Sequence, residues 1–158
     1  MPEGDTVYRV AHRLDRALHG GTVVRFDLRV PELATIDLTG SVVHEVVPRG
    51  KHILMRIGDR TFRSHLRMDG AWHLYRPGER WHAPAHTARA VVATADAEAV
   101  GFDVSMLAVV AATAENELVG HLGPDPLGPD WDLAEAARRV GSDPRPIHVA
   151  LLDPRNVA

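Results

Sequence analysis

Short segments rich in β-branched and aromatic residues follow one another through the middle of the chain, and they constrain the fold more than any other feature. Turn residues separate them, with hairpin turns expected at Gly58-Asp59 and Ala95-Asp96. Strands at this spacing are typical of an antiparallel sandwich or barrel, because parallel units need a helix between successive strands. The predicted strands cover residues 22–28, 41–47, 52–57, 61–66, 71–75, 88–93 and 97–102.

One amphipathic helix precedes these strands. Apolar residues from Val7 to Leu18 recur every three or four positions, which places them on one face of a helix over residues 5–19. Asp5 or Thr6 can cap its first turn, and Gly20-Gly21 ends it. The predicted fold class is therefore α+β, with an N-terminal helix followed by an antiparallel β-sandwich.

The character of the sequence changes after about residue 113. Glycine and proline punctuate residues 120–130, after which Asp132 caps a predicted helix over residues 133–140. Pro144 and Pro146 open a further short helix that runs to Leu152. We therefore predict a domain boundary near residue 125, with a β-sandwich domain over 1–125 and a partial helical domain over 126–158.

Composition narrows the possible functions. The chain has 158 residues and 45% hydrophobic content, which suffices for one globular core. It has no cysteine, which excludes disulfides and thiolate zinc sites. It also shows no apolar run of bilayer length and no secretory leader, so we expect no membrane partner and a cytoplasmic location.

The charge of the chain leaves DNA binding open. A formal net charge of −3 argues against general attraction to a polyanion, since nucleic-acid-binding domains are usually basic. A cluster of cationic residues nevertheless predicts either a local basic face or an ordinary solvated surface. Its members are Arg49, Lys51, His52, Arg56, Arg60, Arg63, His65 and Arg67.

The first residues offer an uncommon nucleophile. Removal of Met1 leaves Pro2 with a secondary α-amine of pKa near ~8, which has more free base at neutral pH than a lysine with a pKa near ~10.4. The positive end of the following helix dipole disfavours its ammonium form. Such an amine condenses with an aldehyde to an iminium ion, and Glu3 can serve as general acid or base. Ordinary punctuation before a helix is the alternative.

Three motifs resemble the formamidopyrimidine-DNA glycosylase and endonuclease VIII family, nearest its actinobacterial endonuclease VIII-like branch. They are the opening Met-Pro-Glu-Gly-Asp-Thr-Val, then Arg49-Gly50-Lys51-His52, then Ser-His-Leu-Arg-Met-Asp-Gly over residues 64–70. The likeness runs in register from Met1 to Ala158 and includes His-Leu-Gly-Pro-Asp over residues 121–125. It implies a bifunctional DNA glycosylase and abasic-site lyase of base excision repair, acting on oxidised bases.

The resemblance implies roles for residues at the matching positions. Pro2 becomes the Schiff-base nucleophile, with β- and then δ-elimination to follow, and Glu3 its proton donor. Lys51 becomes their catalytic partner, in contact with the DNA backbone beside the lesion. Met68 becomes a wedge that enters the gap left by the extruded base, with burial in the core as its alternative. The implied DNA-binding set is Arg49, His65, Arg67, Met68 and Asp69.

The chain departs from the family pattern in two places. Other branches carry glutamate where Thr6 stands, so Asp5 and Thr6 are secondary catalytic candidates for opening of the sugar ring. The chain also ends at Ala158, inside the helix-two-turn-helix element and before the zinc ribbon of longer members. We therefore expect no metal or other cofactor in this chain, although full-length members carry structural Zn²⁺.

Two further functions remain open from the sequence. A catalytically impaired N-terminal fragment that binds damaged or single-stranded DNA is the alternative to an active enzyme, whose expected partners are damaged double-stranded DNA and abasic DNA. A histidine metalloprotein is the third reading, because His82 and His86, with His65 and His73, could ligate zinc. Pro84 interrupts the first pair, which argues against that site. A monomer associated with a bacterial nucleoid is expected.

Overall fold

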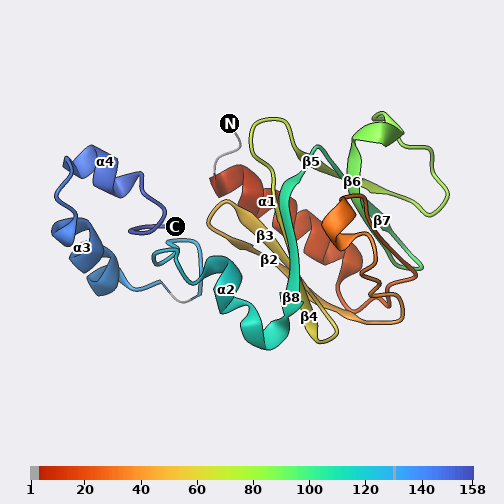
Figure 1. The fold of residues 1–158 in the computed structure, drawn as a ribbon, viewed down its shortest axis with the longest axis horizontal. Coiled ribbons are helices and arrows are strands. Elements are labelled where there is room, and N and C mark those ends of the chain that lie inside the picture. Colours follow the sequence, from red (N-terminus) through yellow and green to blue (C-terminus); the bar gives the residue numbers. More distant parts are fainter. Residues whose placement is uncertain (1–3, 130) are drawn as a thin grey trace.

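The computed structural model describes residues 4–129 and 131–158. Within them the chain begins with helix α1 (Gly4–Leu18), continues through two antiparallel sheets and ends in short helices (Figure 1). No helix in these two stretches is both long enough and apolar enough to cross a bilayer. The helices that follow the sheets are α2 (Asn116–Val119), α3 (Leu133–Ser142) and α4 (Ile147–Leu151).

The two sheets have four strands each, and every neighbouring pair is antiparallel. The strand order is β1-β6-β7-β5 in one sheet and β2-β3-β4-β8 in the other. The predicted α+β fold, an N-terminal helix followed by an antiparallel sandwich, is confirmed. The strands are β1 (Arg25–Leu28), β2 (Val43–Arg49), β3 (His52–Ile57), β4 (Arg60–His65), β5 (Ala71–Tyr75), β6 (Ala88–Ala93), β7 (Glu98–Phe102) and β8 (Ser105–Ala111).

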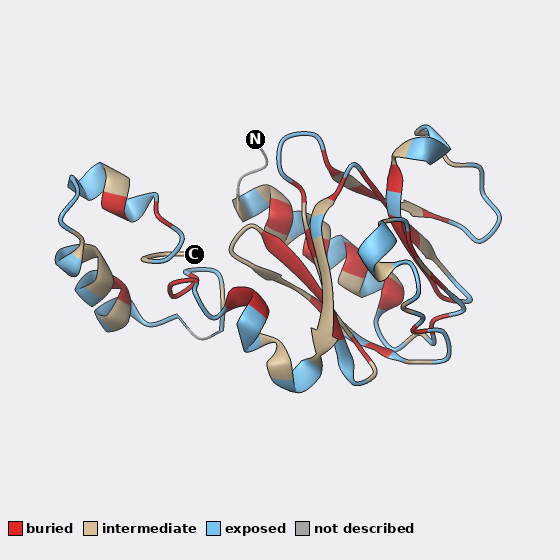
Figure 2. Cartoon of the chain, in the orientation of Figure 1, coloured by how far each residue is buried: buried red, intermediate tan, exposed pale blue. Residues whose placement is uncertain are grey.

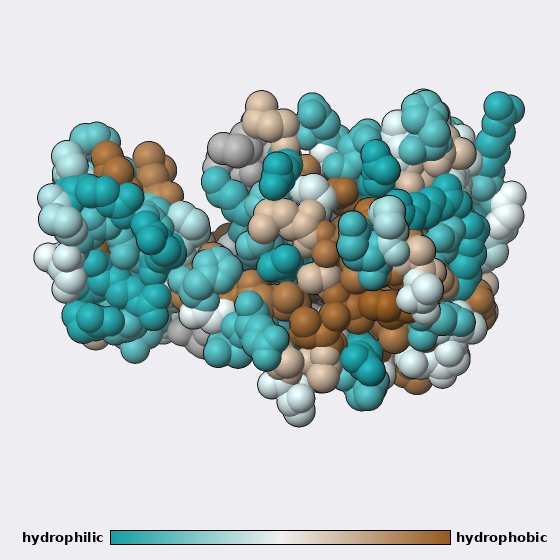
Figure 3. Space-filling model, in the orientation of Figure 1, coloured by the Kyte–Doolittle hydropathy of each residue, from teal (hydrophilic) through white to brown (hydrophobic). Residues whose placement is uncertain are grey.

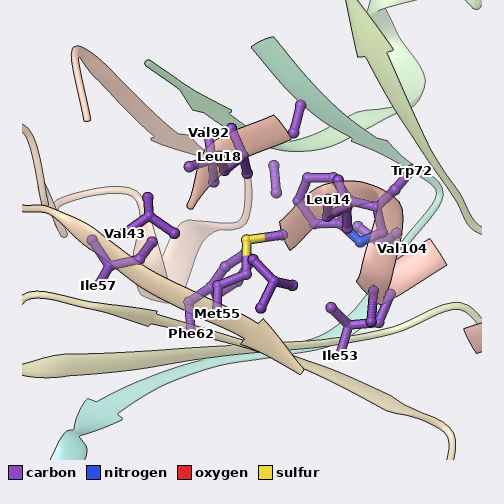
Figure 4. Close-up of a cluster of buried hydrophobic side chains, with 14 of the residues drawn as sticks. Leu14, Leu18, Val43, Ile53, Met55, Ile57, Phe62, Trp72, Val92 and Val104 are labelled. Carbon is purple, nitrogen blue, oxygen red and sulfur yellow. The ribbon is translucent and has the colours of Figure 1, made fainter. Parts of the chain in front are cut away.

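The apolar face of α1 is the centre of the main core. Leu14 and Leu18 meet side chains from both sheets, among them Met55 and Phe62 from one and Val92 from the other (Figure 4). The buried stripe predicted from the apolar spacing is thus correct, and the helix ends at Leu18 as the glycine pair requires. Burial of this stripe fixes the axis of α1, and with it the position of the first turn that begins at Gly4.

Strand β8 and helix α2 were not predicted from the sequence. Residues 105–111 lack the alternation of a half-exposed strand, because α2 covers part of the outer face of this sheet (Figure 2). Leu118 and Val119 of α2 pack there with Leu54. Apolar residues still gather on the surface over the middle of the molecule, where β8 runs (Figure 3).

The early strands begin later than predicted. β1 starts at Arg25 and β2 at Val43, while Thr22 and Val42 form an isolated bridge beyond both strands. A break in the register of β2 against β3 between Val43 and Glu45 marks an irregularity near the start of that pairing. β-Branched residues also precede β1 and β2, outside the hydrogen-bonded part of each sheet, and the sequence prediction therefore started both strands too early.

The last part of the chain folds back on itself. The side chain of Asp132 accepts a hydrogen bond from the backbone N–H of Glu135 at 2.9 Å, so the predicted cap of α3 is confirmed. The N–H of Gly123 donates to the carbonyl of Pro154 at 2.8 Å, and the N–H of Ala158 donates to that of Pro124 at 3.0 Å. The final residues therefore pack against the segment that leads out of the sandwich.

A core truncation tests whether α1 organises the sandwich. Leu14 is 1% exposed, so we expect Leu14→Ala to lower the free energy of unfolding by about 3–5 kcal/mol through lost burial and a cavity. The matched control is Leu133→Ala, because Leu133 is also helical but 68% exposed, and its effect is expected within about 0.5 kcal/mol. Urea unfolding of both variants measures the difference, and equal effects would contradict this view of the core.

Candidate active site

The turn between β2 and β3 is held from a distant part of the chain. Gly50 adopts φ +56°, in the left-handed region that favours glycine, and Lys51 follows it at the turn. The N–H of Gly50 donates to Oδ2 of Asp125 at 3.2 Å, and the N–H of Leu127 donates to Oδ1 of the same carboxylate at 2.9 Å. Asp125 is only 6% exposed, so this buried carboxylate fixes the turn that carries Lys51.

A small cavity joins this turn to the N-terminal end of α1. Its volume is about 190 Å³, and Gly4 and Tyr8 of the first helical turns face Gly50 and Lys51 across it. The C-terminus lies near the start of α1 in Figure 1, and the tip of the β2–β3 hairpin lies close to that terminus. The predicted proximity of Lys51 to the mouth of the helix is therefore present in the structure. The cavity is completed by Pro48, Asp125, Pro126, Leu127 and Ala158.

The two central catalytic residues of the prediction, Pro2 and Glu3, lie outside the described residues. The two secondary candidates differ in what they face. Asp5 pairs with Arg9 at 2.9 Å on an exposed side of α1. Thr6 instead lines a second cavity of about 400 Å³ between α1 and β5, together with Leu66 and Gly70 of the neighbouring turn. This geometry places Thr6, and not the exposed pair, beside the segment that carries Met68.

Residues 67–69 form the tight turn between β4 and β5 that the sequence predicts. Met68 at its tip is 67% exposed, so its expected exposure at the turn is confirmed and burial in the core is excluded. Arg67 and Asp69 flank it and are exposed as well. The turn is closed by a hydrogen bond of 2.9 Å from the N–H of Gly70 to the carbonyl of Leu66.

A histidine pair lies at the base of this turn. His65 ends β4 and stands directly opposite His52 of β3, with the two rings edge to face and their centroids 5.0 Å apart. Nδ1 of His65 accepts a hydrogen bond of 2.9 Å from the backbone N–H of Arg67. Burial, helped by the charges of His65, Arg63 and His121, lowers the pKa of His52 to about 4.

Part of the cationic run serves the fold. Arg56 donates to both carboxylate oxygens of Glu115, at 2.6 and 2.8 Å, and also pairs with Glu45. Its guanidinium holds the pKa of Glu115 below the usual range. Arg63 donates to the carbonyls of Met106 and Leu118, each at 3.2 Å. Of the two interpretations of this run, a local basic face and an ordinary solvated surface, neither describes Arg56 and Arg63, because internal contacts occupy these two guanidinium groups.

Arg49 has a structural contact as well. Its guanidinium donates to the carbonyl of Gly123 at 3.4 Å, which ties the end of β2 to the same segment that carries Asp125. The predicted DNA-binding residues therefore fall into two groups, the β2–β3 turn with Arg49 and the turn that carries Met68. His65 lies between the two groups, because it pairs with His52 next to the first turn and bonds to Arg67 in the second.

The histidines proposed as metal ligands pack against aromatic rings. His73 lies edge to face on Phe102, with centroids 5.4 Å apart, and His82 lies 5.6 Å from the ring of Tyr75. Across residues 4–129 and 131–158, no three side chains of histidine, cysteine, aspartate or glutamate gather in a way that could hold a metal ion. The geometry of these histidines therefore gives no support to the metalloprotein reading.

Comparison with known proteins assigns the family. The model of the formamidopyrimidine-DNA glycosylase N-terminal domain matches residues 1–107. The chain belongs to this family. A probable endonuclease 8 2 of Streptomyces coelicolor is 52% identical over the whole chain, which covers 58% of that relative. A DNA-(apurinic or apyrimidinic site) lyase Nei2 of Mycolicibacterium smegmatis is 48% identical over the whole chain, which covers 62% of it.

Solved structures of this family share the fold. A Lactococcus lactis Fpg in complex with DNA that contains an abasic site superposes with a TM-score of 0.78 at 22% sequence identity, covering 99% of this chain and 62% of that one. Another L. lactis Fpg complex, with tetrahydrofuran-containing DNA and an inhibitor, gives a TM-score of 0.79. This likeness shows the fold of the family. The chain spans about six tenths of the length of the relatives it matches.

Two residues, Asp125 and His52, have roles in the structure that the sequence did not predict. Asp125 lies within one of the motifs that carry the resemblance, but the sequence alone does not show that its carboxylate reaches Gly50. His52 was counted only as part of the cationic run, although it is 7% exposed and neutral near pH 7. The available signal was its place at the start of a strand in which the next three residues are apolar, which predicts a buried ring.

The low pKa of His52 makes stability depend on pH. Between pH 6.5 and about 4 the unfolded chain binds a proton that the folded chain refuses, so the free energy of unfolding falls as the pH is lowered through this window. We expect a loss of roughly 1–2 kcal/mol between pH 7 and pH 5 from this group. His52→Phe keeps an aromatic ring but cannot titrate, and urea unfolding at both pH values should show a smaller loss. An unchanged loss would contradict this assignment.

Proposed function

We propose that the chain is the N-terminal catalytic part of a bifunctional DNA glycosylase and abasic-site lyase that acts on oxidised bases. One observation carries the proposal: the start of α1 and the turn with Lys51 share one cavity, fixed by a buried carboxylate. Membership of the family supports it, as do relatives named endonuclease 8 and DNA-(apurinic or apyrimidinic site) lyase. Residues 1–125 then form the catalytic domain, and residues 126–158 begin a helical DNA-binding domain.

The proposed reaction begins at the α-amine of Pro2. Its lone pair attacks C1′ of the extruded deoxyribose, the bond from C1′ to the base breaks, and the base leaves with that electron pair and a proton. Pro2 loses its N–H proton as the new bond forms, and this proton and one from Glu3 are taken up by the leaving base and the ring oxygen. The bond from the ring oxygen to C1′ then breaks, and the nitrogen lone pair forms the C=N bond of an iminium ion. Because α1 begins at Gly4, two residues after Pro2 in the chain, the positive end of its dipole favours the neutral, nucleophilic form of this amine.

The strand is cut by elimination from the iminium ion. A proton leaves C2′, its electrons move toward the cation, and the bond from C3′ to the phosphate oxygen breaks, so the phosphate departs with the electron pair. Loss of a proton from C4′ then drives a second elimination, in which the bond from C5′ to the other phosphate oxygen breaks and that phosphate departs with the electron pair. Water finally hydrolyses the iminium to an aldehyde and frees Pro2. Lys51 places a positive charge beside the reacting sugar and its phosphates, where negative charge develops.

We assign binding of damaged DNA to the exposed turn that carries Met68 and to the half-buried β2–β3 turn. Met68 is an apolar side chain held out from the surface, as a wedge that replaces an extruded base requires. Arg67 and Asp69 flank it at the level of the opposite base, and Arg49 and Lys51 lie on the other turn. Damaged double-stranded DNA and abasic DNA are therefore the proposed partners, in the cytoplasm of a bacterium at its nucleoid.

Covalent trapping tests the reaction. We expect borohydride to fix the wild-type chain to an oligonucleotide that contains an abasic site, because reduction converts the iminium to a stable amine. Glu3→Gln and Lys51→Gln should lower the trapped fraction, and a chain with an uncleaved N-terminal tag should give none, since its Pro2 nitrogen is an amide.

The outcomes of trapping separate the two functions. Equal trapping with and without the tag would exclude Pro2 as the nucleophile. Salt-dependent DNA binding in a gel shift, without any trapped product, would instead identify the chain as a fragment that binds damaged or single-stranded DNA.

The role of the buried carboxylate gives a second test. Asp125→Ala removes the acceptor for the N–H groups of Gly50 and Leu127, so the turn that carries Lys51 should lose its fixed position. We expect about a tenfold slower single-turnover cleavage of abasic DNA, because small misplacements of reacting groups are costly. Asp125→Asn keeps one oxygen acceptor and should fall between. Wild-type cleavage by a folded Asp125→Ala chain would contradict the role.

A further inference from the structure

The turn that exposes Met68 is fixed at both ends by specific features. At its end, Gly70 leaves no room for a side chain, because a Cβ there would lie 2.4 Å from the carbonyl oxygen of Leu66. At its start, Arg67 adopts φ +51°, a left-handed conformation that is unfavourable for a residue with a side chain. The backbone N–H of Arg67 donates to Nδ1 of His65 at 2.9 Å, and this bond stabilises the unfavourable conformation.

This hydrogen bond requires a neutral imidazole. Nδ1 of His65 can accept only while it carries a lone pair, so the ring proton must lie on Nε2. An imidazolium has N–H groups at both nitrogens and would turn a second donor toward the N–H of Arg67. Protonation of His65 therefore removes the contact that holds the start of the turn.

The surroundings of His65 keep it neutral. Burial, with the positive charges of Arg67, Lys51 and Arg63, lowers the pKa of His65. Those cations come from the turn itself, from the β2–β3 turn and from β4. His52 packs edge to face against the His65 ring at an interplanar angle of 78°, so the ring has a fixed support on the side of β3.

His52 itself faces similar surroundings. It is buried, its Nδ1 has no hydrogen-bond partner within the described residues, and its protonation is disfavoured by the charge of Arg63 and by any protonation of His65 or His121. A ring without a polar partner contributes shape and aromatic contact rather than a hydrogen bond at that nitrogen. Its position directly opposite His65 makes it the packing element that keeps the acceptor nitrogen aimed at Arg67.

We propose that His65 is the positioning residue of the Met68 turn: its neutral ring, supported by His52, holds Arg67 in the left-handed conformation and releases the turn when it is protonated. The inference rests on the proposed function, because it gives Met68 its role in DNA. This role of His65 and a simple contact between His65 and a DNA phosphate predict opposite effects of low pH on the interaction with DNA. A contact between His65 and a phosphate becomes stronger when His65 is protonated at low pH. Under this proposal, insertion of Met68 into DNA becomes weaker when His65 is protonated.

The first test needs only the protein. Hydrogen exchange of the Arg67 amide, followed by NMR and corrected for the intrinsic pH dependence, reports on the hydrogen bond to His65. We expect protection at pH 7.5 that falls by about tenfold in His65→Ala. His65→Asn places an amide oxygen where Nδ1 lies and cannot titrate, so its protection should persist and stay constant down to pH 5.

The role of His52 is tested in the same experiment. His52→Phe retains the ring and should keep the Arg67 amide protected at pH 7.5, whereas His52→Ala should weaken its protection. The imidazole nitrogen resonances of His65 should show a proton on Nε2 and none on Nδ1 in the wild type. A proton on Nδ1, or equal protection in the wild type and His65→Ala, would overturn the proposal.

The second test measures the wedge in DNA. A fluorescent base analogue opposite an abasic site reports unstacking when Met68 enters the duplex, and Met68→Ala sets the signal without a wedge. For fully bound DNA we expect the wild-type signal to fall between pH 7.5 and pH 5, and that of His65→Asn to remain. A wild-type signal that rises at low pH would overturn the proposal in favour of a phosphate contact. If the wild type gives no covalent trapping but its Arg67 amide is still protected from hydrogen exchange, the result would contradict the proposed function and leave the role of His65 in the turn intact.

Discussion

Burial of one face of α1 between two sheets is the constraint on which the site depends. Because Leu14 and Leu18 pack against side chains from both sheets, the helix cannot slide or turn, and its first turn stays beside the β2–β3 hairpin. The carboxylate of Asp125 then fixes the tip of that hairpin through Gly50. The site proposed at the start of α1 needs this rigid frame, because reacting groups must be held close to their productive positions.

The sequence predicted those parts that depend on local patterns. Apolar spacing identified α1, turn residues located the exposed Met68, and Asp132 marked the start of α3. Strand β8 was missed because α2 and the sandwich cover its two faces, so no alternation of polar residues remains. Long-range hydrogen bonds such as that of Asp125 to Gly50 join residues far apart in the chain, and no local pattern encodes them.

Charge was the least reliable guide to the site. A run of cationic residues left a local basic face and an ordinary solvated surface both open, but Arg56 and Arg63 form internal hydrogen bonds and His52 is buried as a neutral ring. Strand alternation cannot separate these roles, because His52, Arg56 and Arg63 lie on the same face of the sheet, opposite the face that packs in the main core. His65 shows the consequence most clearly, since its hydrogen bond to Arg67 assigns it a structural task besides any contact with DNA.

The identity of the covalently bound residue tests the central claim most directly. Tandem mass spectrometry of the borohydride-reduced adduct with abasic DNA locates the deoxyribose remnant on one residue. We predict that it lies on Pro2, as a nucleophile at the mouth of α1 requires. A remnant on Lys51, the single lysine of the sequence, would contradict the account even if the strand were cut.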